Sequence, residues 1–260
     1  MISVLVSGAK GRMGTTIISM VEDAEDMQLI AGVDPVAKDN DTCGNGAPVF
    51  KSLEEALNNV KPDVMVDFTR PDVAEQNLRL ALSKGVNCVL GTTGVSEERL
   101  AEIYDECATD GAALFCAPNF TTGAVLMMLF SKMAAKYFPD AEVIELHHNG
   151  KKDAPSGTAV RTARLIAGAR TQEPQAPGKE TELDGMDGAR GALVDGVPVH
   201  SVRTAGYMAH QEVIFGGMGQ TLTIRHDSID RSCYMPGVAL AIRSIVKQDG
   251  LVIGLENLMD

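Results

Sequence analysis

Short apolar runs alternate with amphipathic stretches from Ile2 to Cys116. Runs of four to eight apolar residues are typical of buried strands, and apolar residues spaced three or four apart are typical of helices. The alternation predicts a parallel sheet with helices on both faces. The predicted strands are Ile2–Ser7, Met27–Asp34, Val64–Phe68, Asn87–Leu90 and Ala113–Cys116, and the predicted helices are Arg12–Val21, Leu53–Asn59, Asp72–Lys84 and Glu97–Thr109.

The pattern changes after Phe120. Three strand-like segments joined by short turns now predict an antiparallel or mixed open sheet. Residues 171–196 are rich in Gly, Pro and Asp and have no periodicity, so we expect a long loop there. The expected elements are a helix over Gly123–Tyr137, a strand Glu142–His147, a helix opening at Ser156, strands Val197–Arg203, Gln211–Phe215 and Thr221–Asp227, and a final helix Pro236–Val246 that could pack back on the first domain.

A glycine-rich loop follows the first strand and opens the first helix. Its sequence is Gly8-Ala9-Lys10-Gly11-Arg12-Met13-Gly14, and Asp34 ends the second strand twenty residues after Gly14. Such glycines let a pyrophosphate approach backbone N–H groups at the positive end of a helix, and the carboxylate can accept hydrogen bonds from ribose hydroxyls. The spacing is G-x-x-G-x-x-G rather than G-x-G-x-x-G, and a purely structural turn is the alternative. Together the two features predict a dinucleotide site.

Pro35 follows Asp34 and carries no positive charge that could meet a 2′-phosphate. This favours NADH over NADPH, although Lys38 is close enough in sequence to supply a cation. Three further segments end later strands on the same sheet edge, where a ligand would be contacted. They are Asp67-Phe68-Thr69, Gly91-Thr92-Thr93-Gly94 and Ala117-Pro118-Asn119-Phe120. Each could be ordinary turn chemistry, but three polar, glycine-bearing strand ends on one edge favour contact with the nicotinamide.

These features predict an α/β protein: a Rossmann-type doubly wound parallel sheet plus an α+β substrate-binding and oligomerisation domain with an open mixed sheet. We place the dinucleotide-binding domain at residues 1–119 and 229–260, and the second domain at residues 120–228. A chain of 260 residues is long enough for two such cores.

Charge and composition narrow the classes of partner. The net charge of −12 argues against a nucleic-acid or anionic-membrane partner, but not against a small anionic substrate. No apolar run approaches the roughly 20 residues of a membrane span. The five cysteines are dispersed without a C-x-x-C pair, which is poor material for disulfides or zinc. We expect a cytoplasmic protein.

The densest group of reactive side chains runs from His147 to Thr158. Two adjacent histidines on a strand would point to opposite faces, unless the strand has ended there. Lys151 and Lys152 follow, and Ser156-Gly157-Thr158 opens a helix whose free N–H groups favour a carboxylate. The segment offers proton donors, a cation and an anion-binding helix end. It lacks the ligand set of a zinc site, and a solvated basic loop is the alternative interpretation.

These segments together resemble the 4-hydroxy-tetrahydrodipicolinate reductases (dihydrodipicolinate reductases) of the diaminopimelate–lysine pathway. The resemblance extends in order over nearly the whole chain. The matching segments are Val6–Gly14, Asp67-Phe68-Thr69-Arg70-Pro71, Gly91–Gly94, Ala117–Phe120, Glu145-Leu146-His147-His148 through Lys151 to Asp153–Thr158, Ser201-Val202-Arg203 and His210-Gln211-Glu212-Val213.

The resemblance implies reduction of a cyclic unsaturated imine bearing two carboxylates, and a homotetramer assembled through the second domain. His147 resembles the family's acid/base histidine and Lys151 its proton donor. Substrate contacts are implied for His148, Gly157 and Thr158. The cofactor contacts implied are Gly8, Ala9, Lys10, Gly11, Arg12, Met13 and Asp34 for the adenosine diphosphate end, and Gly91, Thr92, Thr93, Ala117, Pro118, Asn119 and Phe120 for the nicotinamide.

Two other interpretations remain open. An aspartate-semialdehyde-type dehydrogenase would need a Cys nucleophile just after the loop that follows the fifth strand, where this chain has Phe120. A nucleotide-sensing module without catalysis would bind NADH without turnover, and would leave His147 and Lys151 without a purpose.

Overall fold

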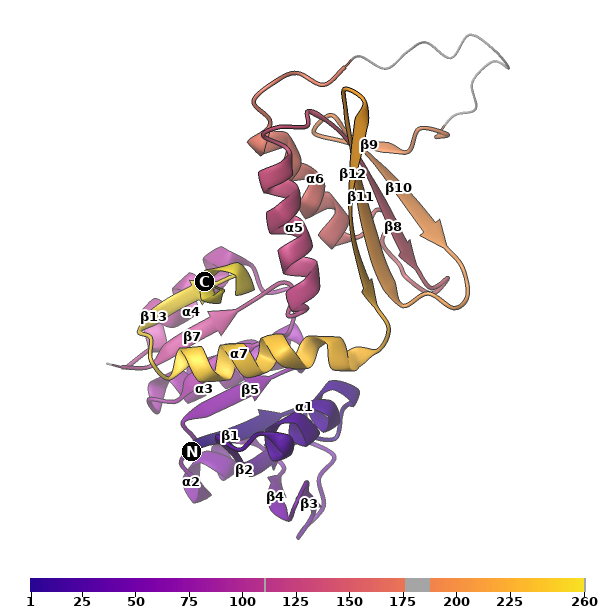
Figure 1. Ribbon diagram of the computed structural model, residues 1–260. Coiled ribbons are helices and arrows are strands. Elements are labelled where there is room, and N and C mark those ends of the chain that lie inside the picture. Colours follow the sequence, from indigo (N-terminus) through magenta and orange to yellow (C-terminus); the bar gives the residue numbers. More distant parts are fainter. Residues whose placement is uncertain (110, 176–187, 260) are drawn as a thin grey trace. The chain divides into compact units, whose positions relative to one another are not determined.

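The computed structural model describes residues 1–109, 111–175 and 188–259 (Figure 1). Contacts divide the chain into two compact units. Unit 1 comprises Met1–Thr122 and Arg231–Asp260, and unit 2 comprises Gly123–Asp230.

Unit 1 is built on an eight-stranded sheet with the order β13-β7-β6-β5-β1-β2-β4-β3. Neighbouring strands are parallel except for the antiparallel pair β3 and β4. This confirms the predicted doubly wound parallel sheet. The strands are β1 Ile2–Ser7, β2 Met27–Val33, β3 Thr42–Cys43, β4 Ala47–Phe50, β5 Val64–Asp67, β6 Asn87–Leu90, β7 Ala113–Cys116 and β13 Gly250–Ile253.

Two groups of helices accompany this sheet. In one, α3 packs on both α2 and α4; in the other, α1 packs on α7 (Figure 1). The strands between them are buried on both faces, and Val4, Leu5 and Val6 have no exposed surface, which explains why they read as continuous apolar runs rather than alternating ones. The helices are α1 Arg12–Asp23, α2 Leu53–Asn59, α3 Pro71–Ser83, α4 Glu97–Cys107 and α7 Met235–Ile245.

The structure adds three short strands to the predicted ones in unit 1. The irregular stretch after Asp34 contains β3 and β4, and β13 pairs in parallel with β7 near the end of the chain. These strands are two and four residues long, which is too short for an alternating pattern to stand out from a loop.

Unit 2 is a five-stranded mixed sheet covered by α6. Its order is β12-β11-β8-β10-β9, in which β8 and β10 are parallel and the other pairs are antiparallel. This confirms the predicted open mixed sheet. Its elements are α5 Thr122–Ala134, β8 Asp140–His147, α6 Gly157–Ala169, β9 Ala192–Val194, β10 Val197–Arg203, β11 Ala209–Gly217 and β12 Gln220–Ser228.

Alternation along the strands of unit 2 buries one face of the sheet against α6. Val143, Val199, Val213 and Phe215 form the centre of this core with Ile166 of the helix. The predicted long loop over residues 171–196 is wrong where β9 lies, and its residues 176–187 are outside the described part of the chain. Within the described ranges, no helix is long and apolar enough to cross a membrane.

Candidate active site

The glycine loop closes tightly between β1 and α1. Gly8 has φ +80° and its N–H donates to the Val33 carbonyl at 2.8 Å. A Cβ on Gly14 would lie 2.0 Å from the Gly8 carbonyl oxygen, so only glycine fits there. α1 begins after Gly11 with no side-chain cap and no acidic residue in its first turn. Its first N–H groups are therefore suited to an external anion such as a pyrophosphate.

Asp34 lies beside this loop. The residue is 8% exposed, and its carboxylate accepts hydrogen bonds from the Lys10 N–H at 2.9 Å and the Val36 N–H at 3.2 Å. A carboxylate has about four acceptor positions, so acceptor capacity remains for ribose hydroxyls. The Lys10 ammonium is ion-paired with Asp41, which also accepts from the Lys38 N–H at 2.8 Å.

The structure brings the strand-end segments of unit 1 together around Phe68. A Cβ on Gly91 would lie 2.0 Å from the tip of the Phe68 ring, and one on Gly8 would lie 3.3 Å from the Phe68 carbonyl oxygen. The Phe68 and Phe120 rings pack with their centroids 5.4 Å apart. The glycine loop and the segments after β5, β6 and β7 therefore form one continuous edge, and their glycines and donors fit a dinucleotide.

Several predicted nicotinamide contacts already have partners within the protein. Buried Asp67 accepts hydrogen bonds from the Thr69 and Thr92 hydroxyls at 2.7 and 3.1 Å. The Asn119 side-chain oxygen accepts from the Thr121 N–H at 2.8 Å. These side chains therefore shape the turns, leaving mainly backbone groups and the exposed Thr93 and Pro118 available for a ligand.

In unit 2, His147 is the last residue of β8, and its ring bonds to a buried carboxylate. The His147 Nδ1 lies 2.5 Å from Glu145 Oε2, and the Glu145 side chain has no exposed surface. Arg203 on β10 is in register with His147 and donates to both Glu145 oxygens, at 2.8 and 2.6 Å. Such bidentate pairing fixes orientation as well as charge.

The contact between Glu145 and His147 affects the pKa of both groups. Burial raises the pKa of the Glu145 carboxyl, but hydrogen bonds from Arg203, Ser201 and His147 outweigh it, so that pKa lies below its ordinary value. Burial lowers the pKa of His147, and pairing with Glu145 offsets this only in part. At neutral pH the site therefore holds an ionised Glu145 and a neutral imidazole.

The loop after β8 carries the other predicted residues. Ser156 caps α6 by accepting from the Ala159 N–H, and its own N–H donates to Glu145 Oε1 at 3.2 Å. The Lys151 ammonium lies 2.8 Å from one oxygen of Asp153, and the Gly157 N–H donates to the other at 3.3 Å. The Asp153 carboxylate thus contacts the predicted proton donor Lys151 and the predicted substrate contact Gly157.

The remaining members of this segment are more open. The strand ends at His147, so His148 is not forced onto the opposite face, and its side chain is exposed. Thr158 is half-buried in the first turn of α6, and a Cβ on Gly157 would meet open space. Lys152 is exposed.

Glu145 and Arg203 were not assigned a role from the sequence. The signal available in the sequence was the alternation along the strands. Glu145 lies on the same side of β8 as the core residue Val143, and Arg203 lies on the same side of β10 as the core residue Val199. A charged residue at such a position needs a partner.

Burial raises the pKa of three cysteine thiols, Cys43, Cys88 and Cys116, which lowers the fraction of reactive thiolate at each. Burial raises the pKa of the Cys116 thiol to about 11 and raises that of Cys88 further. Phe120, where a dehydrogenase of the semialdehyde type would place its chemistry, is 3% exposed and packs on Phe68 and Phe115.

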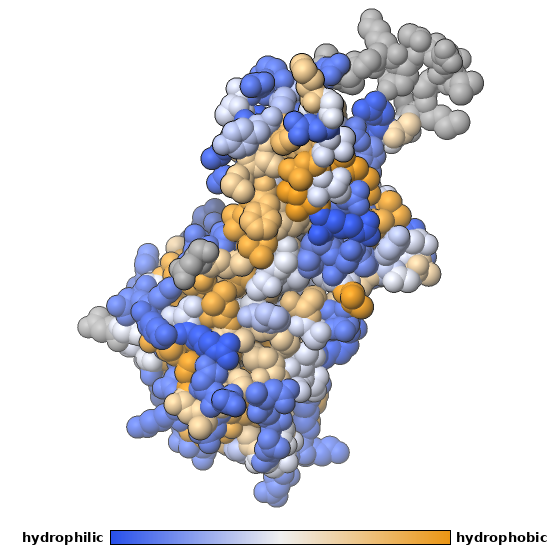
Figure 2. Space-filling view, in the orientation of Figure 1, coloured by the Kyte–Doolittle hydropathy of each residue, from blue (hydrophilic) through white to orange (hydrophobic). Residues whose placement is uncertain are grey.

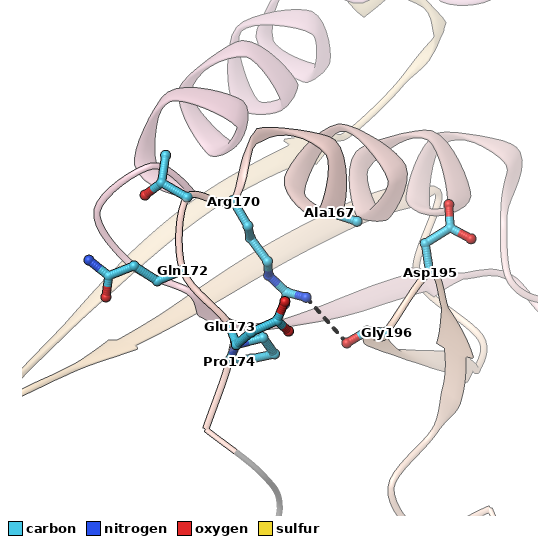
Figure 3. Close-up of a pocket in the computed structure, with 8 residues that line it drawn as sticks. Ala167, Arg170, Gln172, Glu173, Pro174, Asp195 and Gly196 are labelled. Carbon is cyan, nitrogen blue, oxygen red and sulfur yellow. Dashed lines mark hydrogen bonds between the residues drawn. The ribbon is translucent and has the colours of Figure 1, made fainter.

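A separate cavity of about 430 Å³ lies at the C-terminal end of α6, lined by Arg170, Glu173 and Asp195 among others (Figure 3). The His147–Thr158 segment lies at the opposite end of this helix, about 18 Å away along its axis. The cavity contains none of the predicted site residues.

Two family models together match almost the whole chain. The N-terminal model of dihydrodipicolinate reductase matches residues 2–120, and the C-terminal model matches residues 123–259. The 4-hydroxy-tetrahydrodipicolinate reductase of Mycolicibacterium vanbaalenii is 52% identical over 98% of both chains. That of Geobacillus thermodenitrificans is 45% identical over 100% of this chain and 99% of its own.

The comparison with solved structures finds a member of the same family and, at low identity, other proteins of similar fold. A dipicolinate-bound dihydrodipicolinate reductase from Paenisporosarcina sp. TG-14 matches with a TM-score of 0.88 and 42% identity over 100% of both chains. The myo-inositol 2-dehydrogenase of Lactobacillus plantarum covers 99% of this chain and 93% of its own, with a TM-score of 0.62 and 10% identity, a likeness of fold alone.

Proposed function

The chain belongs to the dihydrodipicolinate reductase family, and we propose which of its residues carry that family's reaction. The reaction is the nicotinamide-dependent reduction of 4-hydroxy-tetrahydrodipicolinate to tetrahydrodipicolinate on the diaminopimelate route to lysine. The observation that carries the proposal is the arrangement of His147, Lys151 and Gly157 at the end of β8. A histidine bonded to Glu145 is followed by a loop with a lysine, and the loop leads into the N-terminus of α6.

Loss of the 4-hydroxyl group and a ring hydrogen as water gives the unsaturated imine, and the bound nicotinamide would supply a hydride to a carbon of that ring. The substrate then becomes an enamine, which needs one proton to give the product. Lys151 is the donor of that proton, because its side chain is 23% exposed and is held on the same loop as His147. Neutral His147 acts at its Nε2, since its Nδ1 already bonds to Glu145.

Carboxylate binding uses the groups that Asp153 now occupies. A substrate carboxylate displaces Asp153 from the Gly157 N–H and from Lys151, and gains the positive end of α6. His148 and Thr158, exposed and half-buried beside it, supply further polar contacts. This exchange costs little electrostatic free energy, because one carboxylate anion replaces another.

The cofactor is NADH in preference to NADPH. Asp34 would repel a 2′-phosphate, Pro35 offers no cation, and the Lys10 ammonium is already neutralised by Asp41. The residues that hold the adenosine diphosphate end are Gly8 to Met13 and Asp34, and those that seat the nicotinamide are Gly91 to Thr93 and Ala117 to Phe120.

The protein assembles as a homotetramer in the cytoplasm. Large apolar side chains are exposed on α5 of unit 2, where Figure 2 shows hydrophobic residues gathered: Leu126, Phe130 and Met133 are 36%, 48% and 56% exposed. β12 is also exposed along most of its length. Apolar surface of this kind is typical of an interface between subunits.

The test is a direct assay. The purified protein receives the product of dihydrodipicolinate synthase together with NADH or NADPH, and the loss of cofactor absorbance and the formation of tetrahydrodipicolinate are followed. We expect stoichiometric turnover, faster at equal subsaturating concentrations of NADH than of NADPH. A faster reaction with NADPH would contradict the proposed preference, and tight NADH binding without turnover would favour a sensing module.

A further inference from the structure

We propose that Glu145, held by Arg203, is a positioning residue that keeps His147 in the tautomer with its hydrogen on Nδ1. Nε2 is then the ring atom left for proton exchange. The tautomer assignment stands on geometry alone. Its catalytic consequence rests on the proposed role of His147.

The Glu145 carboxylate can only accept. Arg203 contributes two donors to it, at 2.8 and 2.6 Å, and the Ser156 N–H a third at 3.2 Å. Each of these bonds favours the ionised form. An ionised carboxylate has no hydrogen to give, so at the 2.5 Å contact the hydrogen belongs to His147 Nδ1.

Arg203 is itself held in place. Its guanidinium also donates to the Asp153 carbonyl at 2.8 Å and to the Val202 carbonyl at 2.8 Å. It therefore connects the inward face of β10 to the loop that carries Lys151. The side chains of Glu145 and Arg203 are 0% and 19% exposed, so their geometry has little freedom.

The charges that act on His147 come from three places. β8 contributes Glu145, β10 contributes Arg203, and the following loop contributes Lys151, whose ammonium pairs with Asp153. β11 places the uncharged Ala209 opposite His147. The two cations oppose protonation of the ring, and Glu145 is the anion that contacts the ring directly. Removing Glu145 leaves His147 without that anionic partner, while Asp153 remains paired with Lys151.

The same strand contains a matched pair away from the site. Glu142 lies 2.9 Å from His200 Nε2 and 2.9 Å from an Arg190 nitrogen. This pair also joins a glutamate on β8 to a histidine, in this case on β10, but the Glu142 side chain is 38% exposed. Glu142→Gln therefore controls for loss of a glutamate–histidine contact in the same sheet.

The experiment compares wild type, Glu145→Gln and Glu142→Gln by NMR of ring-labelled histidines, with His147 assigned through His147→Asn. In Glu145→Gln we expect the His147 pKa to fall by about one unit and its Nδ1-protonated fraction to drop. The kcat falls by about ten- to a hundredfold while KM for NADH is unchanged. Glu142→Gln moves the His200 signals only and keeps kcat.

An unchanged His147 tautomer and pKa in Glu145→Gln would overturn the proposal. A shifted His147 signal with unchanged kcat would support the positioning, and would instead contradict the role assigned to His147 under the proposed function. The single variant leaves a buried Arg203 charge unpaired, which can prevent folding. Glu145→Gln/Arg203→Met removes both charges, and the same loss of the Nδ1–H tautomer is expected there.

Discussion

Burial lowers the pKa of His147 and the Glu145 carboxylate raises it, and burial has the larger effect. The His147 pKa therefore lies below the ordinary histidine value of 6.5, and the ring is neutral over most of the physiological range. Since the proposed role of His147 needs the neutral ring, activity on the acidic side falls when the pH drops through this lowered pKa.

We therefore expect the acidic limb of kcat/KM to have its midpoint below 6.5. Rates measured from mild acid to neutral pH check this, and His147→Gln should lose this limb along with most of its activity. A midpoint above 6.5 would mean that pairing with Glu145 outweighs burial, and a limb retained in His147→Gln would belong to another group.

Asp153 competes with the substrate for Lys151 and the Gly157 N–H. The pair with Lys151 is partly exposed, at 23% and 54%, so its strength is at most about 1 kcal/mol. Asp153→Asn should accordingly lower KM for the substrate by up to about fivefold. Steady-state kinetics measure the KM for the substrate. Asp195→Asn, in the cavity at the C-terminal end of α6, is the control variant. A KM that rises would show that Asp153 assists binding.

The sequence alone was enough to single out His147, Lys151 and Gly157, because they are neighbours in one segment. Glu145 and Arg203 are 58 residues apart in the chain. Their bond depends on the parallel register of β8 and β10, which no local pattern specifies. The contact between Asp153 and Gly157 likewise depends on how the loop folds back on the start of α6.

At the scale of elements, the start of α1 packs against the glycine loop with no room for a side chain. A Cβ on Gly14 would lie 2.0 Å from the Gly8 carbonyl oxygen, and a backbone atom cannot move aside cheaply. Gly14→Ala should cost about 1–3 kcal/mol or more of stability and weaken NADH binding at least about tenfold.

Urea unfolding and NADH titration of Gly14→Ala test this contact. Gly168→Ala in α6 is the matched control, because nothing lies within 4 Å of its Cβ position, and alanine there should be neutral or stabilising by up to about 1 kcal/mol. Equal NADH affinity in Gly14→Ala and wild type would show that the glycine loop is not part of the cofactor site.

Strands of unit 1 with three or more consecutive buried residues were predictable, and the shortest strands were not. β1, β6 and β7 have the bounds expected from their apolar runs. β3 and β9, of two and three residues, are defined by pairing with a neighbour rather than by their own pattern. Even so, the order of strands in both sheets depends on contacts between segments far apart in the sequence.

At the scale of the whole molecule, the exposed apolar side chains of α5 and the open β12 favour association. We expect sedimentation equilibrium to give a mass four times that of one chain, and Phe130→Glu to lower it, because a charge replaces an apolar residue that is 48% exposed in the single chain. Glu54→Gln on α2 of unit 1 serves as the control. A monomer at assay concentrations would contradict the proposed assembly.

The central claim is that the segment from His147 to Thr158 carries the proton chemistry of this reductase, with Lys151 as donor. Lys151→Ala and its neighbour Lys152→Ala differ by one position, and Lys152 is exposed. Turnover of the dihydrodipicolinate synthase product with saturating NADH should fall by about 10²–10⁴-fold in Lys151→Ala and stay within about twofold of wild type in Lys152→Ala. Full turnover in Lys151→Ala would contradict the claim.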